Sequence, residues 1–246
     1  MTTGKKSNQQ NVDNMELLTE RVSTFLPEYD PGETRLSIQN QKQVKASGDV
    51  VLLGVTASES ACNNIISART LVFNAIDPLV TRVINALRIS DVSEQTIQQG
   101  ESIVREIRNQ RATVIPPPEN TVGGIESGKP QRTNKMHSGS YNTKTENFRR
   151  LIVLLSTIPA YRPKETELSV ESLNNKLEAL NMINSATKTA DARANAARTQ
   201  RDVVLYTAKT GLVDIAQDSK LYVKSAYGAT SPQFKSVSGI SFSRQR

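Results

Sequence analysis

Apolar residues recur at steps of three and four along most of the chain, which is the spacing that places them on one face of a helix. Met15, Leu18, Val22 and Phe25 form the first such stripe, and Pro27 is expected to end that helix because proline lacks a backbone N–H. The chain has no Trp and only 4% aromatic residues, so its core must be built mainly from Leu, Ile, Val and Ala. Close helix packing suits this composition better than a sandwich of sheets does. The pattern therefore predicts an all-α protein.

Two stretches predict unusually long helices. Residues 38–76 and residues 170–209 contain no proline and keep the helical spacing of apolar or small residues throughout. The alternative is that each stretch folds back as a hairpin, turning near residues 56–60 in the first and 187–191 in the second. Neither of these places contains proline or glycine, so the sequence favours two single long helices.

Ten residues at the entry to the first long stretch recur at the entry to the second. Residues 29–38 (YDPGETRLSI) return as residues 161–170 (YRPKETELSV), a shift of 132 positions at which Tyr, Pro, Glu, Thr, Leu and Ser coincide. Shorter matches before and after this motif keep the same order, so the sequence predicts a tandem duplication of one helical module. The alternative is that two similar helical bundles use similar turn chemistry.

Helix start and stop signals surround the repeated motif. Its serine, Ser37 or Ser169, is expected to cap the helix that follows by accepting a hydrogen bond from a free backbone N–H. Asp77 and Pro78 together predict the start of another helix, and Gly228 is well placed to end the last helix of the second copy.

The two copies differ four residues after the serine. Leu173 in the second copy is placed to pack on the leucine ahead of the cap, as a hydrophobic staple. Gln41 stands at the equivalent position of the first copy, so the staple is lost there.

We interpret these signals as an elongated helical bundle of two related units that are joined by a long connecting loop. Residues 112–145 lack any periodicity and are rich in Pro, Gly, Ser, Thr and Asn, as expected of a flexible linker. The predicted organisation is a disordered N-terminus at 1–11, helical unit one at 12–111, the linker at 112–145, helical unit two at 146–228 and an extended tail at 229–246.

The net charge of +7 is concentrated in the linker and the second half of the chain, and it suggests either a polyanionic partner or a solvated basic face. Arg105, Arg108 and Arg111 share one predicted helix side, which supports an alternative function as a nucleic-acid-binding module. However, Glu101 and Glu106 interrupt this cluster, and no aromatic residues are interleaved for base stacking. Further basic candidates lie in the linker and at the C-terminus: Lys129, Arg132, Lys135, Arg244 and Arg246.

Catalytic and cofactor motifs are weak or incomplete. Cys62 is the single cysteine and His137 the single histidine, so neither an intrachain disulfide nor a site of several Cys and His ligands can form. Residues 123–129 match the first seven positions of a P-loop, but Pro130 stands where a Ser or Thr hydroxyl must reach Mg²⁺. The sequence predicts no catalytic, cofactor or metal site. An enzyme with a polar pocket at the interface of the two units is a lesser alternative.

The N-terminus has no apolar stretch behind its lysines, and the longest apolar runs are too short to cross a bilayer. We therefore expect a cytoplasmic protein, with signal-less export as the alternative. The favoured function is non-enzymatic: a structural or interaction protein that self-associates, or binds a protein partner, through its long helices and its tail. The tail is expected to dock either on its own bundle or on a neighbouring molecule. Its candidate interaction residues are Phe234, Lys235, Ile240, Phe242, Arg244 and Arg246.

Overall fold

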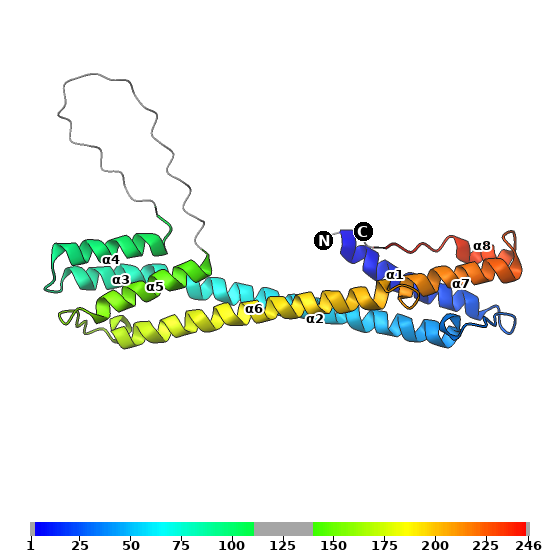
Figure 1. Cartoon of the computed structure of the whole chain (residues 1–246), viewed down its shortest axis with the longest axis horizontal. Helices are drawn as coiled ribbons and strands as arrows, with labels where there is room; N and C mark the ends of the chain where they lie inside the picture. Colours follow the sequence, from blue (N-terminus) through cyan, green and yellow to red (C-terminus); the bar gives the residue numbers. More distant parts are fainter. Residues whose placement is uncertain (1–2, 111–139, 245–246) are drawn as a thin grey trace, which may run out of the picture. The chain divides into compact units, whose positions relative to one another are not determined.

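The computed structural model describes residues 3–110 and 140–244, and every regular element within them is helical. The all-α prediction is therefore confirmed for this part of the chain. In chain order, the elements of Figure 1 are α1 (Thr3–Ser23), η1 (Thr34–Leu36), α2 (Ile38–Asn74), α3 (Ile76–Arg88), α4 (Glu94–Ile107), α5 (Tyr141–Ser156), η2 (Thr166–Leu168), α6 (Val170–Tyr206), α7 (Leu212–Tyr227) and α8 (Pro232–Ser238).

These elements form two compact units that differ from the predicted ones. Unit 1 combines residues 1–63 with residues 189–246, and unit 2 consists of residues 64–188. Each unit therefore takes the first part of one half of the chain and the second part of the other half. The division falls inside α2 and inside α6, so the predicted units at 12–111 and 146–228 do not correspond to compact bodies.

The long helices are continuous, as the sequence favoured, and the hairpin alternative is wrong. Both α2 and α6 contain 37 residues, and their first residues are 132 positions apart. Helices of this length bury little of their surface by themselves, so most of their stability must come from packing against their neighbours.

The two helix entries have the same local geometry. The backbone N–H of Asn40 donates to Ser37 Oγ at 3.3 Å, and that of Ser172 donates to Ser169 Oγ at 3.2 Å, which confirms both predicted caps. The buried Tyr29 hydroxyl donates to the Leu36 carbonyl at 2.8 Å. Its counterpart, the Tyr161 hydroxyl, donates to the Leu168 carbonyl at 2.9 Å. Each tyrosine thus fixes the turn that leads into a long helix.

Two further boundary signals had different outcomes. The restart of the helix near Asp77 and Pro78 is confirmed, but Asp77 is not its N-cap, because α3 begins at Ile76 and Ala75 alone separates it from α2. Gly228 follows the last residue of α7 with a φ of 89°, which a glycine adopts without strain, so this helix end is confirmed.

Three segments that were predicted to be irregular contain helix. Helix α1 starts at Thr3, so residues 3–11 are helical rather than disordered. Helix α5 starts at Tyr141 after the cap Ser140, within the predicted linker. Helix α8 lies within the predicted extended tail, after the cap Ser231. The rest of the predicted linker, including His137 and the P-loop-like residues 123–129, lies outside the described residues.

Each unit has its own apolar core. The face that α3 buries in unit 2 and the face that α7 buries in unit 1 have the same spacing, which starts at Ile76 in one and at Leu212 in the other. The buried residues that share this spacing are Ile76, Val80, Val83 and Leu87 in α3, and Leu212, Ala216, Ser219 and Val223 in α7. The third position is polar only in unit 1, and this difference extends to the residues around it.

Candidate functional site

Unit 2 contains an open groove of about 620 Å³ between α3 and the end of α2 on one side, and η2 and α6 on the other. Its walls are mainly apolar or small, and include Val72, Leu79 and Ala179. Arg82 and Glu167 also line it and form an ion pair, with Nη1 and Oε2 2.5 Å apart. Lys176 lines the α6 side, and no described residue forms an ion pair or hydrogen bond with its ammonium group.

Helices of unit 1 approach one another closely at Gly48. A Cβ atom at Gly48 would lie 2.9 Å from Val12 Cγ2 and 3.3 Å from Leu212 Cδ1, so α1 and α7 approach α2 as closely as glycine allows. The residue 132 positions later is Leu180, which is fully buried and lines the groove of unit 2. Leu180 belongs to the core cluster of unit 2, whereas unit 1 has no side chain at Gly48.

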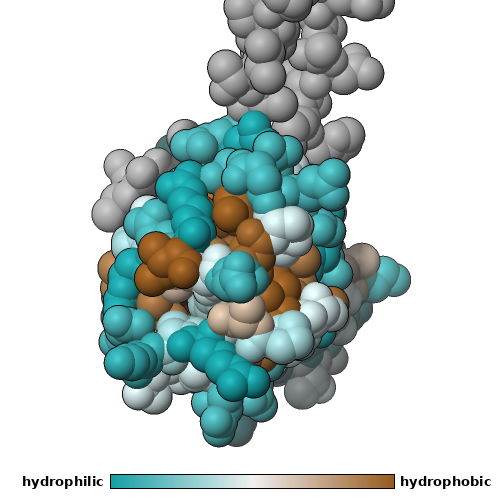
Figure 2. All heavy atoms as spheres, turned by 90° about the vertical axis from the view of Figure 1, so that its left-hand side faces the viewer, coloured by the Kyte–Doolittle hydropathy of each residue, from teal (hydrophilic) through white to brown (hydrophobic). Residues whose placement is uncertain are grey.

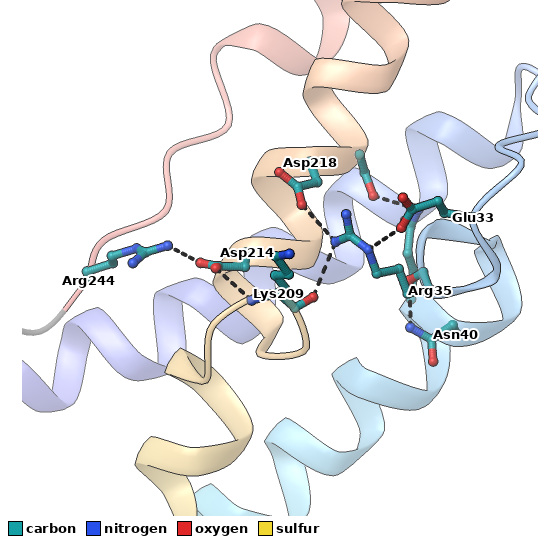
Figure 3. A network of polar contacts seen from close by, with 9 residues as sticks. Glu33, Arg35, Asn40, Lys209, Asp214, Asp218 and Arg244 are labelled. Atoms are coloured by element: carbon teal, nitrogen blue, oxygen red, sulfur yellow. Dashed lines mark hydrogen bonds and ion pairs between the residues drawn. The ribbon is translucent and has the colours of Figure 1, made fainter.

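A network centred on Arg35 occupies the equivalent place in unit 1 (Figure 3). The Arg35 guanidinium pairs with Asp218 at 2.7 Å and with Glu33 at 2.5 Å, and these hydrogen bonds raise its pKa. Arg35 lies 132 positions before Glu167, and Asp218 lies 136 positions after Arg82. The ion pair is therefore present in both units with its charges reversed.

Unit 1 also has additional chain at this place. Five residues, 207–211, separate α6 from α7, whereas Ala75 alone separates α2 from α3. The turn is fixed by the Lys209 N–H, which donates to Asp214 Oδ2 at 3.0 Å, and by the Lys209 carbonyl, which accepts from Arg35 at 3.2 Å. Figure 3 shows this turn beside Arg35. The longer connection therefore covers the region that unit 2 leaves open.

The interior of unit 1 contains a buried polar cluster. The Gln41 amide nitrogen lies 3.0 Å from the Tyr29 hydroxyl, 2.8 Å from the Leu36 carbonyl and 3.1 Å from Ser219 Oγ. The hydroxyl of Thr19 donates to Gln41 Oε1 at 3.2 Å. Burial raises the pKa of Tyr29, which keeps this phenol neutral. The cluster thus consists of uncharged groups whose hydrogen bonds satisfy one another, an arrangement that stabilises a core.

Unit 2 has an apolar interior at the same positions. Leu173 and Val83 replace Gln41 and Ser219, and both are fully buried. Tyr161 is buried there without a side-chain partner for its hydroxyl, and desolvation, followed by the charge of Glu165, raises its pKa to about 12. The staple that the sequence predicted at Leu173 lies in the same core cluster as Leu168.

The outer face of α2 in unit 1 exposes a second apolar surface. Val50 is 68% exposed and Leu53 is 72% exposed, and the exposed Ala46 and Ala57 continue the row in both directions. We call these four residues the outer stripe. Since successive helix residues are 100° apart, the stripe lies opposite the buried face of α2 that contains Val51.

Unit 2 shows apolar surface at its end as well. Figure 2 views the side that lies at the left of Figure 1, where apolar residues gather around a hollow and polar residues surround them. The turn between α3 and α4 lies on this side, and its Ile89 is 88% exposed.

The tail residues proposed for interaction lie mostly on their own unit. Ile240 is buried, and Phe234 and Phe242 pack against the core of unit 1. Arg244 forms an ion pair with Asp214, as Figure 3 shows. Lys235 is exposed. The remaining candidate, Arg246, lies outside the described residues.

Backbone contacts hold the tail in place. The Lys220 ammonium donates to the carbonyls of Ser238 at 3.0 Å and Ile240 at 2.6 Å, and desolvation lowers its pKa. The Asn11 side chain donates to the Ser243 carbonyl at 2.8 Å and accepts from the Ser243 N–H at 3.0 Å. Of the two alternatives that the sequence left open, the structure has the tail docked in cis.

The basic residues proposed for nucleic acid are dispersed or paired. Arg108 donates to the Asp77 carbonyl at 3.1 Å, while Arg105 has no ion-pair partner among the described residues. Glu101 and Glu106, which interrupt the cluster in sequence, pair with Arg88 and Arg150, each at 2.5 Å. Arg111, Lys129, Arg132 and Lys135 lie outside the described ranges.

The charge excess of the second half is also balanced within unit 1. Residues 3–63 carry six basic and eight acidic side chains, and residues 189–244 carry eight basic and four acidic ones. The two segments lie in one unit and share ion pairs such as Arg198–Glu59 and Arg35–Asp218. The asymmetry along the sequence therefore does not produce a strongly basic body.

Within residues 3–110 and 140–244, no three His, Cys, Asp or Glu residues gather as a metal site would require. Cys62 is buried. None of the helices in these ranges is long and apolar enough to cross a membrane.

The groove residues were missed by the sequence interpretation. The signal that could have found them is the shorter connection after α2, because it removes four residues that cover the equivalent surface of unit 1. No family model, curated protein or solved structure matches this chain.

Proposed function

We propose that this chain is a non-enzymatic structural protein that self-associates through the outer faces of its long helices. The observation that carries the proposal is the outer stripe, in which two large aliphatic side chains are more than two-thirds exposed on a helix whose opposite face is buried. Isolated exposed aliphatic residues are common, but a row of them along one helix face is typical of an interaction surface.

The spacing of the outer stripe suits helix pairing. Ala46, Val50, Leu53 and Ala57 are separated by four, three and four residues, which is the a and d pattern of a coiled coil. Gly54 lies beside the stripe, and nothing is within 4 Å of the Cβ atom that it lacks, so a second helix has room to approach. Fully burying Val50 and Leu53 contributes about 1.5–3 kcal/mol each.

A second copy of the same chain is the partner that fits this surface. An apolar row is complementary to itself, and a two-fold contact places the same patch on both subunits. The charged residues beside it do not oppose such pairing, because the Lys45 ammonium already lies 3.0 Å from carboxylate oxygens of Glu16 and Asp49.

We further infer that the two halves of the chain descend from one duplicated helical module. The support is the order of elements, the two equal long helices and the equivalent bonds of Tyr29 and Tyr161. This origin is consistent with a structural role.

Sedimentation velocity of the full chain over a wide concentration range tests the proposed function. We expect a concentration-dependent dimer, and we expect the double variant Val50→Asp/Leu53→Asp to associate much more weakly because it places charges in the apolar contact. The matched control is Leu221→Asp, which changes a leucine that is 62% exposed on α7 and lies outside the stripe. A monomeric wild-type chain, or a double variant that associates as strongly as the wild type, would overturn the proposal.

A further inference from the structure

We infer that the groove of unit 2 binds the loop between α1 and η1 from unit 1 of a second copy. This inference rests on the proposed self-association and names a second surface for it. The first reason is that the groove provides both an apolar surface and positive charge. Val72, Leu79 and Ala179 line it, Lys176 is unpaired within the described residues, and Arg82 has only Glu167 as a partner.

Unit 1 shows what kind of segment can lie beside the equivalent ion pair. There, the turn at 207–211 lies over the equivalent ion pair and presents the Lys209 carbonyl to the guanidinium of Arg35. Unit 2 has the same ion pair with reversed charges and lacks this turn. A short irregular segment is therefore the kind of structure that the groove of about 620 Å³ fits, and a helix is not required.

The loop between α1 and η1 has the complementary chemistry. Leu26 is 55% exposed and is followed by the exposed Pro27, Glu28 and Asp30. Neither the Glu28 nor the Asp30 carboxylate forms an ion pair with a described residue. An apolar tip beside two unpaired carboxylates matches an apolar groove beside Lys176 and Arg82.

The equivalent loop of unit 2 does not have this chemistry, which gives the contact a direction. Arg162 and Lys164 stand at the positions of Asp30 and Gly32, and Ile158 packs against the core instead of being exposed. The basic loop would be repelled by Lys176, so the groove distinguishes the two loops. A groove on unit 2 that binds a loop on unit 1 is a heterologous contact, which continues from copy to copy unless it closes into a ring.

The turn between α3 and α4 is the rival occupant, because Ile89 is exposed and Asp91 follows it. In this turn one carboxylate, Asp91, lies within four residues after Ile89, whereas in the loop of unit 1 two carboxylates, Glu28 and Asp30, lie within four residues after Leu26. The groove therefore has fewer charges to pair with if this turn enters it, and we assign the groove to the unit 1 loop.

Fluorescence anisotropy with a labelled synthetic peptide of residues 23–32 tests the assignment. The receptor is the full chain carrying Val50→Asp/Leu53→Asp, so that outer-stripe association cannot contribute. We expect saturable binding that Ala179→Trp and Lys176→Glu each weaken by about tenfold or more, since one blocks the apolar wall and the other reverses the charge. A peptide of residues 155–164 is the matched control and is not expected to bind.

A charge exchange between full-length chains gives a second readout that does not depend on the peptide adopting the loop conformation. Sedimentation of Glu28→Lys alone and Lys176→Glu alone should show weakened growth beyond the dimer, and an equimolar mixture should recover it. The assignment would be overturned if both single variants formed assemblies larger than the dimer to the same extent as the wild-type chain. The assignment would also be overturned if the peptide of residues 23–32 bound the Ala179→Trp receptor as tightly as the receptor without this change. The same holds if a peptide of residues 87–93 displaced the labelled peptide at a lower concentration than unlabelled peptide 23–32 does. Failure of the proposed outer-stripe dimer gives a different result from failure of the groove assignment. In that case the wild-type chain and the Val50→Asp/Leu53→Asp variant sediment alike.

Discussion

The interiors of the two units differ most clearly at Gln41 and Leu173, which occupy the same position after the two helix caps. In unit 1 the position is polar, and Tyr29, Thr19 and Ser219 surround it with hydrogen-bonding groups. In unit 2 the leucine lies in a core cluster that keeps Tyr161 but has Ile152 and Val83 in place of Thr19 and Ser219. The comparison teaches that one backbone arrangement accepts either kind of interior, provided that all the residues around the position change together.

The surfaces of the two units differ at the Arg35 network and the groove. Unit 1 covers the position with an extra turn that Arg35 holds, and unit 2 leaves an open space beside Arg82 and Lys176. Two helical frames with a similar order of elements therefore differ at this connection. A binding surface can arise in such a frame by shortening one connection, without any change of fold.

The largest expected effect comes from placing the polar residue of unit 1 into the core of unit 2. Leu173→Gln should lower the free energy of unfolding by about 4 kcal/mol, because it removes a buried leucine and buries an amide that lacks the two hydroxyl partners found at Thr19 and Ser219 in unit 1. Urea denaturation followed by circular dichroism measures this loss. A loss below about 1 kcal/mol would show that the core of unit 2 tolerates polar groups.

The reverse change should cost less and should be correctable. Gln41→Leu removes the Gln41 amide from the Ser219 hydroxyl, the Tyr29 hydroxyl and the Leu36 carbonyl, so we expect a loss of about 2 kcal/mol in the free energy of unfolding. The combination Gln41→Leu/Thr19→Ile/Ser219→Val copies the residues of unit 2 and should recover most of that loss. If the loss of the triple variant equals the sum of the losses of the three single variants, the interiors around Gln41 and Leu173 are not equivalent.

The reversed ion pairs should differ in their contribution to stability. Arg35→Ala should lower the free energy of unfolding by about 1 kcal/mol, because the Arg35 side chain is 29% exposed and also holds the Lys209 turn. Arg82→Ala should change it by less than about 0.5 kcal/mol, because an exposed pair contributes little. Thermal unfolding of both variants makes the comparison, and equal losses would contradict it.

The smallest effect at neutral pH concerns Tyr161. Burial raises its pKa to about 12, whereas an unfolded tyrosine ionises near 10, so the unfolded chain loses this proton first. The stabilisation is fully present below pH 10 and is lost as the pH rises from 10 to 12. Stability curves of wild type and Tyr161→Phe should therefore have different slopes only above pH 10. Parallel curves across that range would contradict the raised pKa.

Local signals made part of this fold predictable. The caps at Ser37 and Ser169 and the glycine at 228 act within one turn of helix, so the sequence around them determines their role. The continuity of α2 and α6 follows from the absence of proline and from no glycine at the places where a hairpin would turn.

The parts that depend on distant residues could not be predicted in this way. Asn8 and Asn11 make a polar sequence helical because they lie against Tyr206 and the tail, about 200 residues away. The tail docks in cis because Lys220 and Asn11 hold its backbone. The division of each long helix between two units depends on which helices pack together, and neither periodicity nor capping contains that information.

Native-state hydrogen exchange tests most directly whether the two units are built from exchanged halves of the chain. Amides in α1 should share one opening free energy with those in α7, and amides in α5 should share another with those in α3 and α4. The triple variant Val50→Asp/Leu53→Asp/Lys176→Glu weakens both proposed contacts and keeps the measurement on the monomer. If α1 instead opens together with α3 and α4, and α5 opens together with α7, the exchanged arrangement of the two units is contradicted.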